Sequence, residues 1–140
     1  MNKQNINIKC DDRESGALVN ELNKINVYCS PIRLKVGDYV CEELSLCIEY
    51  KTINDFCLSV MDGRIESQSL RMKDNYLHNY IIISGKINDK IQNIHENCII
   101  GMISKLTYNN LNVIILDNEK QCAYIIRRLI ERYTEKYSEQ

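Results

Sequence analysis

The fold is decided by residues 36–52, which read VGDYVCEELSLCIEYKT. Two mainly apolar runs, 36–41 and 46–51, flank a short polar link around Glu42 and Glu43. Apolar runs of this length with a polar link between them are typical of two strands that pair with each other. This stretch therefore predicts an antiparallel hairpin inside a sheet.

The charged residues of this hairpin fall where they can act together. Successive strand side chains point to opposite faces, so Glu49 and Lys51 project from one face and Tyr50 projects from the other. The near ends of the two strands would bring Asp38 and Glu49 within reach of one ion. Asp38 is also explained as a turn residue after a glycine. The downstream Glu and Lys favour the metal site.

On either side of the hairpin, short strands alternate with helices. Alternating apolar and polar residues predict strands, and apolar residues at a helical spacing predict amphipathic helices. This order implies an α/β fold, with a mixed central sheet and helices on both of its faces. The predicted strands are Ile6–Cys10, Val27–Ser30, Val36–Cys41, Leu46–Lys51, Tyr80–Ser84 and Asn112–Leu116. Five helices are predicted. The first has Leu18, Leu22 and Ile25 on one face, and the second begins after a cap at Thr52 and ends at Asp62-Gly63. The other three span Arg64–Asn75, Glu96–Thr107 and Gln121–Tyr137.

Composition agrees with one domain over residues 1–140. At 44% hydrophobic content the chain can bury a core. It has no apolar run long enough to cross a bilayer, and its start lacks the apolar core of a secretory signal, so we expect a soluble, intracellular protein of the cytoplasm or nucleus that does not bind membranes. Its seven cysteines form no Cys-x-x-Cys pair and are expected to be buried free thiols. No glycine-rich phosphate loop is present, so ATP use is not expected.

The acids near the hairpin suit hydrolysis of a phosphodiester. A hard cation held by carboxylates can supply the attacking water and neutralise charge on phosphate. Mg²⁺ is the expected ion, with Mn²⁺ as a substitute. We predict Asp38 and Glu49 as its ligands and Asp11 as a third ligand or a ligand of a second metal. The carbonyl of Tyr50 would complete the set. Lys51 would orient the water or stabilise charge on the phosphate.

Five segments together resemble a known family. The chain has Asp-Asp-Arg-Glu at 11–14, Gly-Asp at 37–38, Glu-Tyr-Lys at 49–51, a trailing Asp55, and Asp-Gly-Arg at 62–64 followed by Gln68. From about Ile8 to the last helix it is similar to the nuclease domain of the XPF/Mus81/Hef family, also called the ERCC4 domain. The resemblance implies a restriction-endonuclease-like nuclease fold. It also implies a metal-dependent, structure-specific endonuclease that cuts branched or flapped DNA in repair or recombination.

The resemblance also suggests roles for residues outside the hairpin. Glu14 would contact a metal-bound water and Arg13 would contact phosphate, although a salt bridge at the start of a helix explains both as well. Arg64 and Gln68 would touch the DNA backbone, or else be structural. Asp55 is expected to be an acid in the first turn of a helix, where it would support Lys51 without binding the metal itself.

Two positions depart from the family pattern. Tyr50 stands where relatives have Arg, and Ser84-Gly85 stands where they tend to have Glu-Gly. Because Tyr50 is expected to face away from the metal ligands, its presence need not remove the ion site, but it could lower activity.

DNA is the expected partner, although a net charge of −1 argues for modest affinity from this domain alone. Relatives pair through late helices and append a helix-hairpin-helix module, which this sequence does not contain. We therefore expect a homodimer, or a heterodimer with another ERCC4-type or helix-hairpin-helix protein. Two other functions stay open: a non-catalytic partner subunit or DNA-binding module, and a restriction-type or transposon-associated nuclease that cuts specific sequences.

Overall fold

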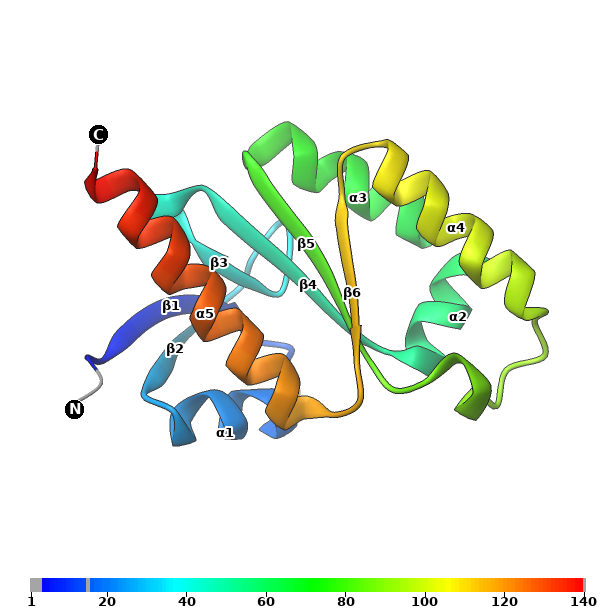
Figure 1. Cartoon of the computed structure of the whole chain (residues 1–140), viewed down its shortest axis with the longest axis horizontal. Helices are drawn as coiled ribbons and strands as arrows, with labels where there is room; N and C mark the ends of the chain where they lie inside the picture. The colour runs from blue at the N-terminus through cyan, green and yellow to red at the C-terminus, as the bar shows by residue number, and fades with distance from the viewer. Residues whose placement is uncertain (1–3, 15, 140) are drawn as a thin grey trace.

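A mixed sheet forms the centre of the chain in the computed structural model, which describes residues 4–14 and 16–139. In this part of the chain the strands lie in the order β2-β1-β3-β4-β5-β6 (Figure 1). Neighbouring strands are parallel except around β3, which runs antiparallel to both β1 and β4. The strands are β1 Ile6–Asp11, β2 Val27–Ile32, β3 Tyr39–Cys41, β4 Leu46–Thr52, β5 His78–Ser84 and β6 Asn112–Leu116.

Helices cover both faces of the sheet. One core lies between the sheet and the pair α1 and α5, and a second lies between the sheet and α2, α3 and α4. Their bounds are α1 Gly16–Lys24, α2 Ile53–Met61, α3 Arg64–Asn75, α4 Glu96–Tyr108 and α5 Glu119–Ser138, with 3₁₀ turns at Glu42–Leu44 and Ile87–Asp89.

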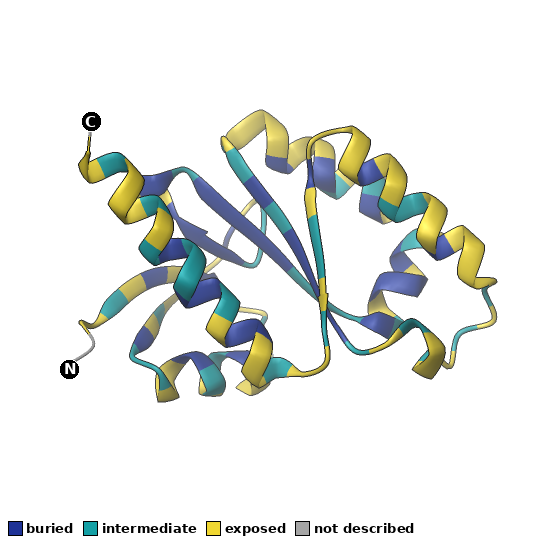
Figure 2. Cartoon of the chain, in the orientation of Figure 1, coloured by how far each residue is buried: buried dark blue, intermediate teal, exposed yellow. Residues whose placement is uncertain are grey.

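The alternation of side chains along β5 shows how one strand serves both cores. Ile82 belongs to the core under α1 and α5, whereas Ile81 and Ile83 belong to the core under α2, α3 and α4. All three are fully buried. Figure 2 shows the same pattern as a band of buried strand residues with exposed residues on the outer sides of the helices. The predicted α/β fold is therefore confirmed.

The hairpin forms as predicted, but its first strand is shorter than expected. The prediction began at Val36, whereas β3 begins at Tyr39. Gly37 has a positive φ of 77°, and a Cβ at this position would lie 2.4 Å from Sγ of Cys47. The chain therefore turns at a residue that only glycine fits, and strand pairing starts after this turn.

Two other local predictions agree with the structure. Thr52 caps α2, because its Oγ1 accepts a hydrogen bond from the Asp55 amide at 3.2 Å. Pro31 lies inside β2, which runs two residues further than the predicted Val27–Ser30. This strand is at the edge of the sheet, where the missing N–H of proline leaves no ladder bond unmade.

A buried arginine fastens the last helix to the other end of the chain. Arg127 on α5 is only 3% exposed. Its Nη1 donates to the carbonyl of Ile25 at 2.8 Å, and its Nη2 donates to the carbonyl of Gln4 at 3.0 Å. These bonds satisfy backbone groups next to β1 and β2 that the sheet leaves without partners.

The seven cysteines are free, and five of them are buried. Across residues 4–14 and 16–139, no helix combines the length and the apolar character needed to cross a bilayer.

Candidate active site

The predicted site lies at one edge of the sheet. The strands β1 and β4 point the same way, because each is antiparallel to β3 between them. Asp11 ends β1 and Glu49 lies in the middle of β4, and the register of both strands with β3 places them beside Asp38, the residue just before β3. The hairpin and the first strand together bring the predicted acids to one place.

Asp38 is held by hydrogen bonds to both neighbouring strands. Its amide donates to the Ile48 carbonyl at 2.9 Å, and its carbonyl accepts from the Asp11 amide at 2.8 Å. Its side chain Oδ2 accepts from the Tyr50 amide at 2.8 Å. The Asp38 carboxylate is thus fixed to the strand that carries Glu49 and Lys51.

Glu49 and Glu14 both lie close to the Asp38 carboxylate. Glu49 is 7% exposed, and burial together with Asp38 raises its pKa to about 9, although Lys51 acts in the opposite direction. Burial and Asp38 also raise the pKa of Glu14 to about 8. Glu14 Oε2 accepts a hydrogen bond from the buried Tyr39 hydroxyl at 3.1 Å. Three carboxyl groups are therefore crowded together with too little positive charge beside them to keep all three ionised at neutral pH.

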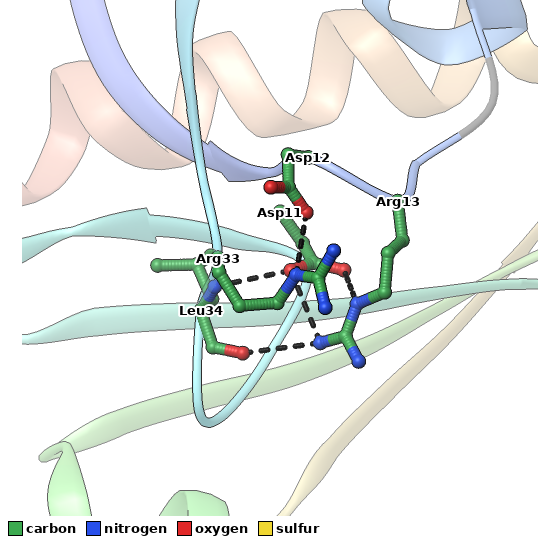
Figure 3. Close-up of polar contacts among 5 residues, drawn as sticks. All are labelled: Asp11, Asp12, Arg13, Arg33 and Leu34. Carbon is green, nitrogen blue, oxygen red and sulfur yellow. Dashed lines mark hydrogen bonds and ion pairs between the residues drawn. The ribbon is translucent and has the colours of Figure 1, made fainter.

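Asp11 is close to this group, but its oxygens are already in use (Figure 3). Arg13 donates from Nε to Oδ2 at 2.8 Å and from Nη2 to Oδ1 at 3.1 Å, and the Leu34 amide donates to Oδ1 at 3.0 Å. Burial opposes the charge of Asp11, but these bonds outweigh it and lower its pKa. In this arrangement Asp11 is an anchor for Arg13. Its role as a third ligand stays a prediction.

Arg13 forms the salt bridge with Asp11 and not with Glu14. The same guanidinium reaches the Leu34 carbonyl, 3.2 Å from Nη2. A second pair, Arg33 with Asp12 at 2.7 Å, lies beside it on the surface (Figure 3). The salt-bridge alternative for Arg13 thus holds in part, with a different acid from the expected one.

Tyr50 projects away from the acids, as strand alternation predicts. It packs against the core under α1 and α5. Its hydroxyl donates to Oε1 of Glu119 at 3.4 Å, at the first turn of α5. Tyr50 therefore contacts the last helix and lies on the opposite face of β4 from Glu49.

The residues predicted to touch DNA differ in where they point. Arg64 is paired with Asp62, with 2.7 Å between Nε and Oδ2, and does not line the site. Gln68, one turn further along α3, does line it. Within the described residues, no hydrogen bond or ion pair joins the Asp55 carboxylate to Lys51.

A pocket of about 300 Å³ opens over the acids. Its lining is almost entirely polar and includes four predicted residues besides Gln68, namely Asp11, Arg13, Asp38 and Glu49. Lys35 and Arg71 also line it, and they were not predicted as site residues. Arg71 follows Gln68 by three positions, a helical spacing that places both side chains on one face and that could have indicated it.

The acids lie close together, but in this structure their oxygens do not form a set of metal ligands. Among residues 4–14 and 16–139, no three Asp, Glu, His or Cys side chains are grouped as a metal-binding set. Asp38 is nevertheless near enough to Glu14 and Glu49 to raise the pKa of both.

The raised pKa of Glu49 makes stability depend on pH. Its folded pKa lies above the unfolded value, so its contribution to stability is complete below the unfolded pKa of about 4.5 and is lost as the pH rises toward about 9. In EDTA, Glu49→Gln should therefore melt at a higher temperature than the native protein, and the gap should widen from pH 5 to pH 9. Glu135→Gln, which changes an exposed acid on α5, is the matched control. A gap that stays constant across this range would contradict the prediction.

The chain matches known proteins along most of its length. The ERCC4 domain profile matches residues 10–129. A protein named 3'-flap repair endonuclease Xpf, from Saccharolobus solfataricus, is 30% identical over 133 residues, covering 91% of this chain and 56% of that protein. The chain thus spans little more than half of that relative's length.

Two solved structures have the same fold. XPF from Aeropyrum pernix matches with a TM-score of 0.80 and 25% identity, over 95% of this chain and 67% of that one. XPF from the same organism in complex with DNA matches with a TM-score of 0.81 and 25% identity, over 94% and 66% of the two chains. The ERCC4 profile match runs from the end of β1 into α5 and so covers most of the chain. The Gly-Asp and Glu-x-Lys segments lie next to each other in the sheet. The chain therefore belongs to the ERCC4-domain family.

Proposed function

We propose that this protein is a metal-dependent, structure-specific DNA endonuclease that hydrolyses phosphodiester bonds in branched or flapped DNA. One observation carries the proposal: Asp38 and Glu49 meet at the edge of the sheet, with Lys51 two residues beyond Glu49 on the same strand. The name of the Saccharolobus relative, a 3'-flap repair endonuclease, supports a flap as the substrate.

The donor groups fit Mg²⁺, with Mn²⁺ as its substitute. Mg²⁺ prefers oxygen ligands, and it is usually bound by one or two carboxylates together with water and substrate phosphates. Asp38 and Glu49 would be those carboxylates. A cation bound there would favour the ionised form of Glu49 and of Glu14 beside it, whose pKa values are raised by burial and by Asp38. An ion bound there would act as a Lewis acid toward the phosphate and would make a water more acidic.

The protein groups around the two ligands have separate tasks. Lys51 carries a positive charge on the same face as Glu49, where it would stabilise the charge that develops on the phosphate. Glu14, whose Oε2 accepts from the Tyr39 hydroxyl, would contact a water held by the ion. Arg13, fixed by Asp11, would meet the phosphate with its exposed end.

The proposed function is tested by cutting labelled DNA. Flap, fork and linear duplexes of one sequence should be incubated with the protein and Mg²⁺. We expect cleavage near the branch of the flap and fork, and little cleavage of the linear duplex. Cleavage that follows sequence and ignores branching would select a restriction-type nuclease. The absence of cleavage with both Mg²⁺ and Mn²⁺ would favour a non-catalytic partner subunit.

We also propose that the protein forms a homodimer through α5. A groove of about 1020 Å³ lies between the end of α1 and the first half of α5, with apolar residues such as Leu116 and Ile125 along it. Tyr124 lies in this groove and is 55% exposed. A two-fold dimer would bury this apolar surface.

Light scattering should find twice the mass of one chain at tens of micromolar, roughly the range of ordinary dimers. Tyr124→Glu should give a monomer, because it would bury a charge in the interface. Tyr108→Glu is the control, since Tyr108 on α4 is 86% exposed and lies away from the groove. A native protein that is monomeric under these conditions would exclude the homodimer and leave a heterodimer as the alternative.

A further inference from the structure

We infer that Lys35 and Arg71 bind the backbone phosphates on either side of the scissile one, so that the active-site pocket grips the DNA strand by its backbone and not by its bases. The inference rests on the proposed nuclease function and names the part of the substrate that this pocket recognises.

The composition of the pocket decides which part of a nucleotide it can take. The lining of the 300 Å³ pocket is almost entirely polar, and it contains no aromatic residue from the described part of the chain. A base needs a flat apolar or aromatic surface on which to stack. A phosphodiester needs positive charge and hydrogen-bond donors. The pocket offers only the second kind of surface.

The two cations come from different walls of the pocket. Lys35 lies in the loop before Gly37, and Arg71 lies in the middle of α3. Both are exposed, and neither has a carboxylate within ion-pair distance among residues 4–14 and 16–139. In contrast, Arg64 on the same helix is neutralised by Asp62. Lys35 and Arg71 therefore keep their full charge for a ligand.

The acids of the pocket determine where phosphates can approach the two cations. Asp38 and Glu49 repel phosphate unless a cation lies between them and it, so the strand can approach closely only at the scissile position. The neighbouring phosphates then fall toward the walls, where the positive side chains are. This arrangement of acids at the floor and cations at the rim fits a strand laid across the pocket.

Gln68 provides a second, independent sign of a missing ligand. Its Oε1 is buried and has no hydrogen-bond partner among the described residues. A buried oxygen without a donor costs free energy, and such groups usually have a partner in the working state. Gln68 lines the same pocket one helical turn before Arg71. A donor that enters with the substrate, such as a water on the phosphate, would satisfy it.

The test is the salt dependence of binding. Fluorescence anisotropy should be measured with a labelled flap and with Ca²⁺ in place of Mg²⁺, so that the DNA stays uncut. Lys35→Ala with Arg71→Ala should weaken binding at least about tenfold, because two charged contacts are lost. The slope of log K against log salt should become shallower by about 0.7 to 0.9 for each contact. Flaps with different bases at the cut site should bind equally.

The control is a variant with the same change in charge, Lys73→Ala with Lys86→Ala. Lys73 lies on α3 outside this pocket, and Lys86 follows β5. An equal loss of slope in both double variants would overturn the inference, because the effect would then come from net charge alone. So would a native protein that does not bind the flap. If the native protein binds but cleaves nothing, the nuclease proposal fails, while the comparison of slopes still decides the role of these two residues.

Discussion

Asp38→Asn should abolish cleavage of the flap with both Mg²⁺ and Mn²⁺, and it should also abolish the rise in melting temperature that these ions give to the native protein. Asparagine keeps an oxygen that can accept from the Tyr50 amide, so the bond that fixes this side chain survives. The substitution removes the charge that would hold the ion. A cation that binds only the folded protein raises its stability, so a lost ligand appears directly in the melting curve.

Melting curves and cleavage should be recorded for the same preparations. Asp74→Asn, on the exposed side of α3, is the matched control and should behave like the native protein in both measurements. If Asp38→Asn still shows the ion-dependent rise, then Asp38 does not hold the metal. If the ions leave the native melting curve unmoved, the metal site itself is in doubt.

Lys51→Ala should lower the rate of cleavage by a factor of at least about a hundred, the usual scale for a lost group that stabilises charge in the transition state. Lys51 follows Glu49 on the same face of β4 and its charge acts on the Glu49 carboxyl, so in the proposed reaction its ammonium group would offset charge that develops on the phosphate. The fold should survive, because Lys51 is only partly buried and belongs to neither core. Single-turnover measurement on the flap separates this effect from binding.

The ion-dependent rise in melting temperature should remain in Lys51→Ala, since the carboxylates are untouched. Lys86→Ala, which removes a cation outside the pocket, is the control and should keep the native rate. Cleavage by Lys51→Ala at the native rate would leave Lys51 with a structural role only.

The hairpin and its charges could be predicted because they depend on local rules. Strand alternation alone predicts Glu49 and Tyr50 on opposite faces of β4, whereas the turn at Gly37 fell inside the predicted strand 36–41. The start of α2 could also be predicted from local sequence, because the capping residue Thr52 and its partner Asp55 lie three positions apart. Each of these features is set by residues within a few positions of one another.

The missed features depend on contacts between distant segments. The Leu34 amide reaches Asp11 across 23 positions of the sequence. Arg127 is buried and donates to the backbone carbonyls of Gln4 and Ile25, which are more than a hundred positions away in the sequence. Lys35 and Arg71 belong to one pocket only because the loop and α3 meet in space. Helical spacing links Arg71 to Gln68, but no spacing along one segment shows that Lys35 lies in the same pocket.

The hydrogen bonds of Asp38 have a consequence for the entropy of catalysis. The Asp38 carboxylate is tied to the amide of the residue that separates Glu49 from Lys51, and its own backbone joins β1 to β4. The conformational freedom of these groups is therefore given up when the chain folds, and little of it remains to be lost when substrate arrives. Asp38 is thus fixed before substrate binds, so in the proposed hydrolysis a looser junction would slow the reaction even with every reactive group still present.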